Sequence, residues 1–307
     1  MTRELTAATE HAGVRLDAFL SADGALTRSQ AARLIAEGRV RVNGKPAAKS
    51  ARLSGGETVT VDVPQLRETA LPPQDIPLDV VYEDDDVIVV NKPTGLVDPP
   101  APGHPDGTLV IALLHHCGDS RSGIGGEKRP GIVHRIDKDT SGLVLAAQNG
   151  YAAPLLAQRV EKLYYAVVEG ELPLGPGVID APIGRQGESS IGRCVTPDGK
   201  PSRTEYTILK AQNGLSLAAC VPVTGRTHQI RVHFASIGHP LAGDDLYGGS
   251  RARIGRQALH CAKQTFWVPR CEPMPDGIGI EVPVDETTLR PVTVESPLPE
   301  DMTKLFV

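Results

Sequence analysis

The chain has few cysteines, few aromatic residues and no long apolar run. Its five cysteines are scattered, odd in number and never spaced C-x-x-C, which argues against a disulfide framework or a zinc cluster and favours a reducing compartment. No segment approaches the roughly 20 apolar residues of a membrane span. Residues 1–13 include Glu4 and Glu10 and no apolar run, so they do not predict a signal peptide. We therefore expect a cytoplasmic protein without a membrane or metal partner.

Acidic and basic residues are unevenly distributed along the chain. The net charge of −5 argues at first against a nucleic-acid partner, but residues 27–52 alone have a net charge of +6. This stretch sets Glu37 against seven basic residues: Arg28, Arg33, Arg39, Arg41, Lys45, Lys49 and Arg52. A second stretch, residues 246–271, has five basic residues and no acid. Because charges act over about 8–10 Å, local patches matter more for phosphate contacts than the total charge does.

Residues 14–63 predict a small separate module. Residues 27–35 carry good helix formers after a capping residue, and Gly38 is typical of a helix end. Residues 39–45 alternate charged and β-branched side chains as far as an Asn-Gly pair, which predicts a hairpin, and residues 58–63 predict another strand. The four prolines of residues 64–77 then indicate an extended linker.

Residues 78–307 predict a larger α+β domain. Short β-rich runs are expected to form strands at 78–82, 87–90, 163–169, 202–210, 215–221, 229–234 and 264–269. Helices are expected at 108–116 and 150–159, and a helix at 231–237 competes with the strand at 229–234. Many strands with few intervening helices favour a mixed, largely antiparallel sheet.

The most informative stretch is residues 129–142, RPGIVHRIDKDTSG, which the apolar run LVLAA follows. If the stretch is extended, Arg135 and Asp137 point to one face while His134 and Ile136 point to the other. A charged loop between buried segments often holds a functional site. Composition alone leaves a surface turn equally acceptable.

The segment HRIDKDTSG resembles the signature loop of the RluA-type pseudouridine synthases, which convert uridine to pseudouridine in RNA. Asp137 matches the catalytic carboxylate of that family, and the nearby Asp139 does not. The resemblance extends to five further blocks, at 87–97, 162–170, 225–233, 257–260 and 296–302. Residues 14–63 resemble the αL RNA-binding module of the ribosomal S-four type. The chain departs from the pattern at Asp98, where relatives often have histidine, and at Ile111, where they often have asparagine.

The resemblance implies a pseudouridine synthase fold and a reaction that needs no cofactor, because it is an isomerisation. It implies that Asp137 acts on a flipped-out uridine, that Arg231 is the ion-pair partner of Asp137, and that Tyr164 stacks on the target base. In an extended 229–234 segment, Arg231 would share one face with Gln229 and His233. His228 and His233 are five residues apart, a spacing that does not suit a zinc site.

The resemblance also implies the contacts with RNA. Arg135 would fill the gap that the flipped base leaves, with a simple phosphate contact as the alternative. The basic residues of the N-terminal module would bind the RNA backbone, and we name Arg28, Arg33, Arg39, Arg41 and Lys45.

We therefore expect an enzyme that isomerises specific uridines in structured RNA. Large-subunit ribosomal RNA is the favoured target and transfer RNA the alternative; the modified position and the oligomeric state stay open. Two other classes of function compete. A non-catalytic RNA-binding assembly factor would tolerate the loss of Asp137, and a nucleoside hydrolase with paired carboxylates would release free uracil.

Overall fold

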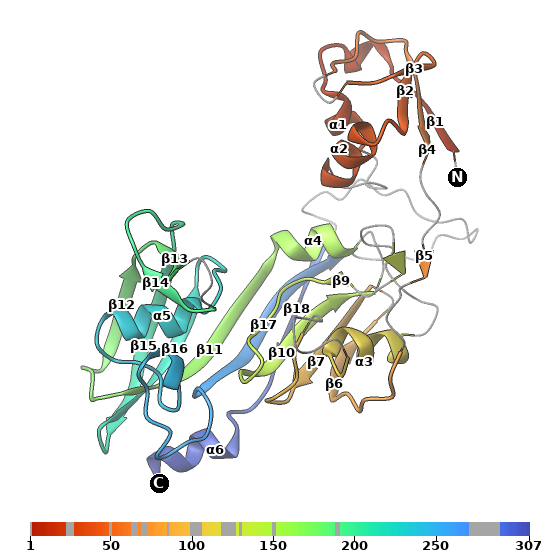
Figure 1. Cartoon of the computed structure of the whole chain (residues 1–307). Helices are drawn as coiled ribbons and strands as arrows, with labels where there is room; N and C mark the ends of the chain where they lie inside the picture. The colour runs from red at the N-terminus through yellow and green to blue at the C-terminus, as the bar shows by residue number, and fades with distance from the viewer. Residues whose placement is uncertain are drawn as a thin grey trace.

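The structure is a computed structural model with two folded parts, a small N-terminal domain set apart from a larger domain (Figure 1). It describes residues 2–22, 28–48, 51–62, 67–68, 73–84, 86–98, 106–117, 127–128, 131–148, 152–187, 191–269 and 289–307. Within these residues no helix is both long and apolar enough to cross a membrane.

The small domain is a four-stranded antiparallel sheet with two helices against it. The strand order is β1-β4-β2-β3, with β1 at Thr2–Thr6, β2 at Val40–Val42, β3 at Lys45–Pro46 and β4 at Thr58–Asp62. The helices are α1 at Leu16–Phe19 and α2 at Arg28–Ala36, and a 3-10 turn, η1, lies at Thr9–His11. The core of this domain is fully buried and consists of aliphatic side chains such as Leu16, Leu34 and Val59.

The expected helix and hairpin are present in this domain. Asn43 and Gly44 both have positive φ angles, 49° and 76°, as a two-residue hairpin turn requires. The sheet also includes β1, which precedes the segment 14–63 expected to form the module. Of the expected linker 64–77, residues 67–68 form the short strand β5 (Arg67–Glu68), which pairs in parallel with β8 (Glu127–Lys128). Residues 64–66 and 69–72 lie outside the described part.

The larger domain contains a ten-stranded sheet of order β12-β15-β16-β11-β17-β10-β7-β6, with β18 beside β17 and β9 beside β10. Its strands are β6 at Val80–Glu83, β7 at Val87–Lys92, β9 at Gly131–Ile132, β10 at Ser141–Ala147, β11 at Val160–Glu169, β12 at Gly175–Asp180, β15 at Arg203–Gln212, β16 at Leu215–Pro222, β17 at Leu259–Pro269 and β18 at Leu289–Glu295. Within the described strands of this sheet, only β10 and β17 pair in parallel. The expected mixed, largely antiparallel α+β fold is therefore confirmed.

The remaining elements surround this sheet (Figure 1). A two-stranded hairpin is formed by β13 at Ile183–Arg185 and β14 at Arg193–Val195. The helices are α3 at Leu109–His116, α4 at Ala152–Gln158, α5 at Gln229–Ser236 and α6 at Glu300–Thr303, with 3-10 turns η3 at Asp245–Tyr247 and η5 at Lys304–Phe306. The helices expected at 108–116 and 150–159 are thus present as α3 and α4.

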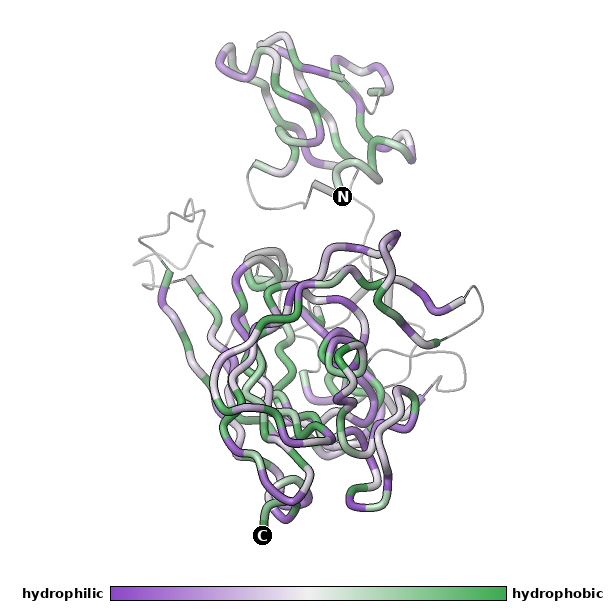
Figure 2. The backbone as a smooth tube through the Cα atoms, turned by 90° about the vertical axis from the view of Figure 1, so that its left-hand side faces the viewer, coloured by the Kyte–Doolittle hydropathy of each residue, from purple (hydrophilic) through white to green (hydrophobic). Residues whose placement is uncertain are grey.

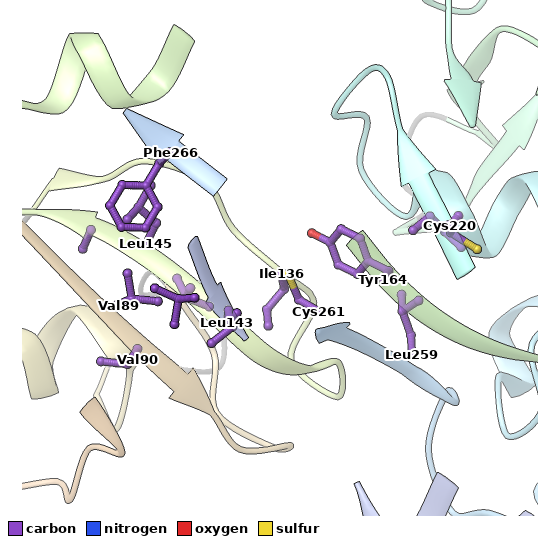
Figure 3. Packing of buried hydrophobic residues seen from close by; sticks show 14 of the residues in the cluster. Val89, Val90, Ile136, Leu143, Leu145, Tyr164, Cys220, Leu259, Cys261 and Phe266 are labelled. Atoms are coloured by element: carbon purple, nitrogen blue, oxygen red, sulfur yellow. The ribbon is translucent and has the colours of Figure 1, made fainter. Parts of the chain in front are cut away.

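The core of the larger domain lies along β7, β10 and β17. Strand β10 is buried at every residue because both of its faces are covered, so it is apolar throughout instead of alternating. Leu143, Leu145 and Phe266 belong to the same buried cluster there (Figure 3). Figure 2 shows the corresponding apolar stretches inside the larger domain. The loop that carries Asp137 leads directly into β10 and is therefore fixed to the most buried part of the fold.

The strand expected at 229–234 is wrong, because these residues form the helix α5. The first six residues of α5 are all buried, so the alternation of polar and apolar residues there does not reflect one exposed and one buried face. The polar side chains are buried with hydrogen-bond partners, as Gln229 shows. Its Oε1 accepts hydrogen bonds from Thr224 and from the amide of Arg226, and its Nε2 donates to Thr204. The competing helix expected at 231–237 matches the fold more closely.

Candidate active site

Asp137 lies in the loop between β9 and β10. This loop ends where β10 begins to pair with its neighbouring strands. Gly142 has a φ of 108°, and a Cβ at this position would overlap the backbone of Cys261 on β17. Only glycine meets both conditions. The side chains that precede β10 alternate as expected, since Ile136 is buried and Arg135 is exposed.

Arg231 binds Asp137 and is itself held by a second carboxylate. Arg231 Nη1 donates to Asp137 Oδ2 at 2.8 Å, while its Nε and Nη2 donate to both oxygens of Asp244 at 2.7 and 2.8 Å. The side chains of Arg231 and Asp244 are 7% and 1% exposed, and that of Asp137 is 21% exposed. The guanidinium also lies 5.0 Å from the ring centroid of Tyr247. Such bidentate pairing fixes the orientation of a planar guanidinium, so Arg231 is aligned before any substrate arrives.

The electrostatics of this group favour a charged Arg231 and a neutral His228. Burial opposes the charge on Arg231, but its hydrogen bond to Asp244 and the attraction of Asp137 and Asp244 outweigh this effect and raise its pKa. Burial lowers the pKa of His228, and the positive charge of Arg231 adds to this, against the attraction of Asp137. His228 Nε2 lies 3.7 Å from Asp137 Oδ1. A neutral imidazole therefore lies beside the second oxygen of the carboxylate.

Tyr164 extends from β11 into the same region. The residue is 7% exposed, and its ring lies near Ile136 and Cys261 (Figure 3). Burial, together with the neighbouring Cys261 thiol to which it hydrogen-bonds, raises the pKa of Tyr164 well above its ordinary value, so the phenol stays protonated. The pairing of β11 with β17 has a bulge between Leu163 and Tyr164, which re-aims a side chain locally. Tyr165, on the opposite face, packs against a separate apolar cluster, as expected from the strand alternation.

These side chains line one pocket of about 480 Å³, a volume within the usual range for small-ligand sites. Asp137, Tyr164, Arg231 and His228 lie in its wall, together with Lys162. Burial lowers the pKa of Lys162. Arg135 belongs to the same wall and is exposed.

The basic residues expected to bind RNA differ in how the structure uses them. Arg39 pairs with Asp62 at 2.8 Å and with Glu37 at 3.3 Å. Arg41 and Lys45 are exposed on the β2–β3 hairpin, and neither has an ion pair within the described part of the chain. Arg28 and Arg33 belong to α2, but their side chains lie outside the described part.

Metal ligands do not gather at this site. Among the residues that the structure describes, no three or more His, Cys, Asp or Glu side chains form a group that could hold a metal ion. His228 and His233 serve different partners: His228 Nδ1 is 2.7 Å from the Tyr247 hydroxyl, and His233 Nδ1 is 2.8 Å from Thr204 Oγ1.

Sequence reasoning missed three side chains next to the pair of Asp137 and Arg231. Asp244 and Tyr247 hold Arg231 and His228, and nothing in the sequence distinguishes Asp244 from Asp245, which is exposed and pairs with Arg251. His228 was considered only as a metal ligand. The motif at residues 225–233, which contains His228, was the sequence signal that could have identified it as a site residue.

Fold and site together define an enzyme. A carboxylate held at 2.8 Å by a fixed guanidinium lines a pocket of an α+β domain, and a separate small domain precedes it. A binding module has no need to keep a buried arginine between two carboxylates, whereas catalysis by a carboxylate needs its charge and orientation fixed in advance.

Comparison with known proteins identifies the family. The model of the RNA pseudouridylate synthase family matches residues 86–236, and that of the S4 domain matches residues 14–59. The chain is 42% identical to the uncharacterized RNA pseudouridine synthase YlyB of Bacillus subtilis, over 99% of this chain and 96% of that protein. It is 41% identical to ribosomal large subunit pseudouridine synthase D of Zymomonas mobilis, over 87% and 90% of the two chains.

A solved structure is similar as well. The human protein RNA pseudouridylate synthase domain containing 1 superposes with a TM-score of 0.53 at 28% identity, over 74% of this chain and 85% of that one. The chain therefore belongs to the RNA pseudouridylate synthase family and is an RNA pseudouridine synthase with an S4 domain.

Proposed function

We propose that this enzyme converts uridines of large-subunit ribosomal RNA to pseudouridine, and that Asp137 is its catalytic carboxylate. The observation that carries the proposal is the ion pair of Asp137 with Arg231 at 2.8 Å in the wall of a pocket. The choice of RNA is supported by relatives from Zymomonas mobilis, Neisseria meningitidis and Yersinia pestis, each named ribosomal large subunit pseudouridine synthase D.

The reaction exchanges one bond for another. The bond from ribose C1′ to uracil N1 breaks, the uracil turns, and a bond from C1′ to C5 forms while C5 loses a proton and N1 gains one. Atoms and electrons balance within the nucleotide, so the isomerisation consumes no co-substrate. Asp137 attacks or stabilises the nucleotide during bond cleavage. Arg231 keeps this carboxylate ionised and in place, because an adjacent positive charge favours the charged form.

The remaining pocket residues act on the base. Tyr164 stacks on the uracil, and its protonated hydroxyl lies in a region from which burial excludes water. A duplex hides its bases, so the target uridine has to leave the stack before Asp137 reaches it. Arg135, exposed at the pocket, fills the space that the uracil vacates, because a planar guanidinium stacks between bases.

The N-terminal domain supplies affinity. Arg41 and Lys45 project from the β2–β3 hairpin without an ion pair in the described part of the chain, so their charges are available to phosphates. We assign the same role to Arg28, Arg33 and Arg39, with Arg39 weakened by its two acidic neighbours. We propose residues 14–63, 64–77 and 78–307 as the module, linker and catalytic domain, with β1 completing the sheet of the module.

Mapping of pseudouridines in total RNA from a deletion strain tests this function. We expect defined pseudouridines to disappear from large-subunit ribosomal RNA, to return with the wild-type gene and with Asp139→Asn, and to stay absent with Asp137→Asn. Loss confined to transfer RNA would overturn the choice of substrate. Restoration by Asp137→Asn would overturn the catalytic role of Asp137.

A further inference from the structure

The backbone on both sides of Asp137 is held by buried charged side chains. The amide of Ile136, the residue before it, donates to Asp98 Oδ2 at 2.7 Å. The carbonyl of Lys138, the residue after it, accepts from Lys92 Nζ at 3.0 Å and from the amide of Gly95 at 2.9 Å. Asp98 and Lys92 are each 1% exposed. Asp98 and Lys92 thus form a clamp that holds the backbone of the loop, while Arg231 holds the carboxylate of Asp137.

The two clamping residues come from one short stretch of chain. Lys92 ends β7 and also donates to the carbonyls of Pro93 and Leu96, at 3.1 and 2.7 Å, so its three protons are all used. The neighbouring residue Val97 forms a bridge with Thr108, and the carbonyl of Asp98 accepts a hydrogen bond from the amide of Val110 at 3.1 Å. These contacts fix Asp98 beside the first turn of α3. The clamp is therefore part of the core and is not a mobile surface contact.

The burial of Asp98 lowers the stability of the fold. Its Oδ1 is buried and has no hydrogen-bond partner in the described part of the chain. Burial of a carboxylate is unfavourable unless its oxygens are well paired. Burial raises the pKa of Asp98 to about 6, against the attraction of Lys92 and the hydrogen bond from Ile136. An apolar side chain would avoid this cost but would leave the Ile136 amide without an acceptor.

The residue type at this position supports an acceptor function. An ionised carboxylate only accepts hydrogen bonds, and it is not typical of a buried core position.

We propose that Asp98 is a positioning residue, which with Lys92 fixes the loop so that the carboxylate of Asp137 meets both Arg231 and the flipped uridine. The proposal rests on the catalytic role of Asp137 proposed above. A catalytic group displaced by about 1 Å can lose on the order of a hundredfold in rate. Loss of the clamp should therefore slow the chemical step without weakening the binding of RNA, because Asp98 is only 1% exposed and has no surface for an RNA contact.

Single-turnover kinetics on an RNA stem-loop test the clamp, with rate constant and RNA affinity measured separately on the full chain. Asp98→Ala should slow pseudouridine formation by about ten- to a hundredfold, with RNA affinity unchanged within about twofold. Asp98→Asn and Asp98→His keep an acceptor and should recover most of the rate. Asp139→Ala is the matched control, since this carboxylate of the same loop has no hydrogen bond in the described part of the chain and should leave the rate unchanged.

Three outcomes would overturn the clamp: a wild-type rate for Asp98→Ala, equal loss for Asp98→Ala, Asp98→Asn and Asp98→His, or loss that lies entirely in RNA affinity. If Asp98→Ala does not fold, the two conservative variants still decide, because the clamp predicts near-normal rates for both. Activity of Asp137→Asn would refute the catalytic role instead. An inactive Asp137→Asn beside a fully active Asp98→Ala would refute only the clamp.

Discussion

Residues 27–52 and 246–271 are both strongly basic in sequence, but they use their charges differently. In the second stretch each described basic side chain has a partner outside the stretch. Arg251 pairs with Asp245, Arg256 with Asp301 and Lys263 with Glu295, each at 2.8 Å. Arg253 donates to the carbonyl of Asn213. In the first stretch, Arg41 and Lys45 have no ion pair within the described residues.

The two stretches are similar in local composition, but their basic residues differ in whether an acidic partner neutralises the charge. A charge paired with an acid is partly neutralised for an approaching phosphate, whereas an unpaired exposed charge keeps its attraction. Arg231 is the third case: it is buried, it is held by two carboxylates, and it fixes Asp137.

The largest effect is expected where the paired arginine is buried. Arg231→Met leaves Asp244 and Asp137 without their counter-charge, which should lower the free energy of unfolding by about 3–5 kcal/mol and the rate of pseudouridine formation by at least about a hundredfold. Urea denaturation and single-turnover assays measure the two effects. Arg251→Met breaks an exposed pair and should cost no more than about 1 kcal/mol. Equal losses for the two variants would remove the distinction.

A smaller effect concerns the pH dependence of stability. A carboxyl whose pKa is raised in the folded state destabilises the fold as pH rises through the interval between its unfolded and folded pKa values. For Asp98, with a folded pKa of about 6, the free energy of unfolding should fall by about 3 kcal/mol as pH rises from about 4 to about 6. The groups that face Asp98 electrostatically are Lys92, Arg135 and Asp137.

Asp98→Asn isolates this contribution. The variant lacks the titration, so its free energy of unfolding relative to the wild type should rise between pH 4 and pH 7. His134, whose pKa burial lowers to about 3, acts in the opposite direction, because the unfolded state binds its proton first. It is present in both proteins and cancels in the difference. Denaturation curves at four pH values measure this, and a difference that does not change with pH would contradict the burial of an ionised Asp98.

The smallest effect is expected in RNA affinity. Arg41→Ala with Lys45→Ala should weaken binding to a stem-loop by about tenfold at moderate salt and reduce the slope of log affinity against log salt by about 1 for each contact removed. Arg251→Ala with Arg253→Ala removes the same charge from the paired stretch and should leave the slope nearly unchanged. Fluorescence anisotropy over a potassium chloride series measures both. An equal change in the two slopes would mean that pairing does not set phosphate affinity.

Much of the fold could be predicted from local pattern. The Asn43-Gly44 hairpin, the helix at 108–116 and the buried run after Gly142 depend on residues next to one another in sequence, and the structure has all three. The strand expected at 229–234 failed because alternation there reflects burial on all sides of α5. Packing against the rest of the domain, and not the two-residue periodicity of the sequence, determined the secondary structure there.

The candidate site divides in the same way. Asp137 and Arg231 were paired from their motifs, and the structure places their side chains 2.8 Å apart. Asp244 and Lys92 were not foreseen as parts of the site, because their roles depend on contacts across the fold. Lys92 reaches the carbonyl of Lys138 only because β7 and β10 are neighbours.

The most direct test of the account is single-turnover formation of pseudouridine by Asp137→Asn beside Asp139→Asn, at saturating enzyme on one RNA. The two variants remove the same charge from one loop, two residues apart. We predict no product above background for Asp137→Asn, with RNA affinity within about twofold of the wild type, and a normal rate for Asp139→Asn. Product from Asp137→Asn at a rate within about tenfold of the wild type would contradict the account.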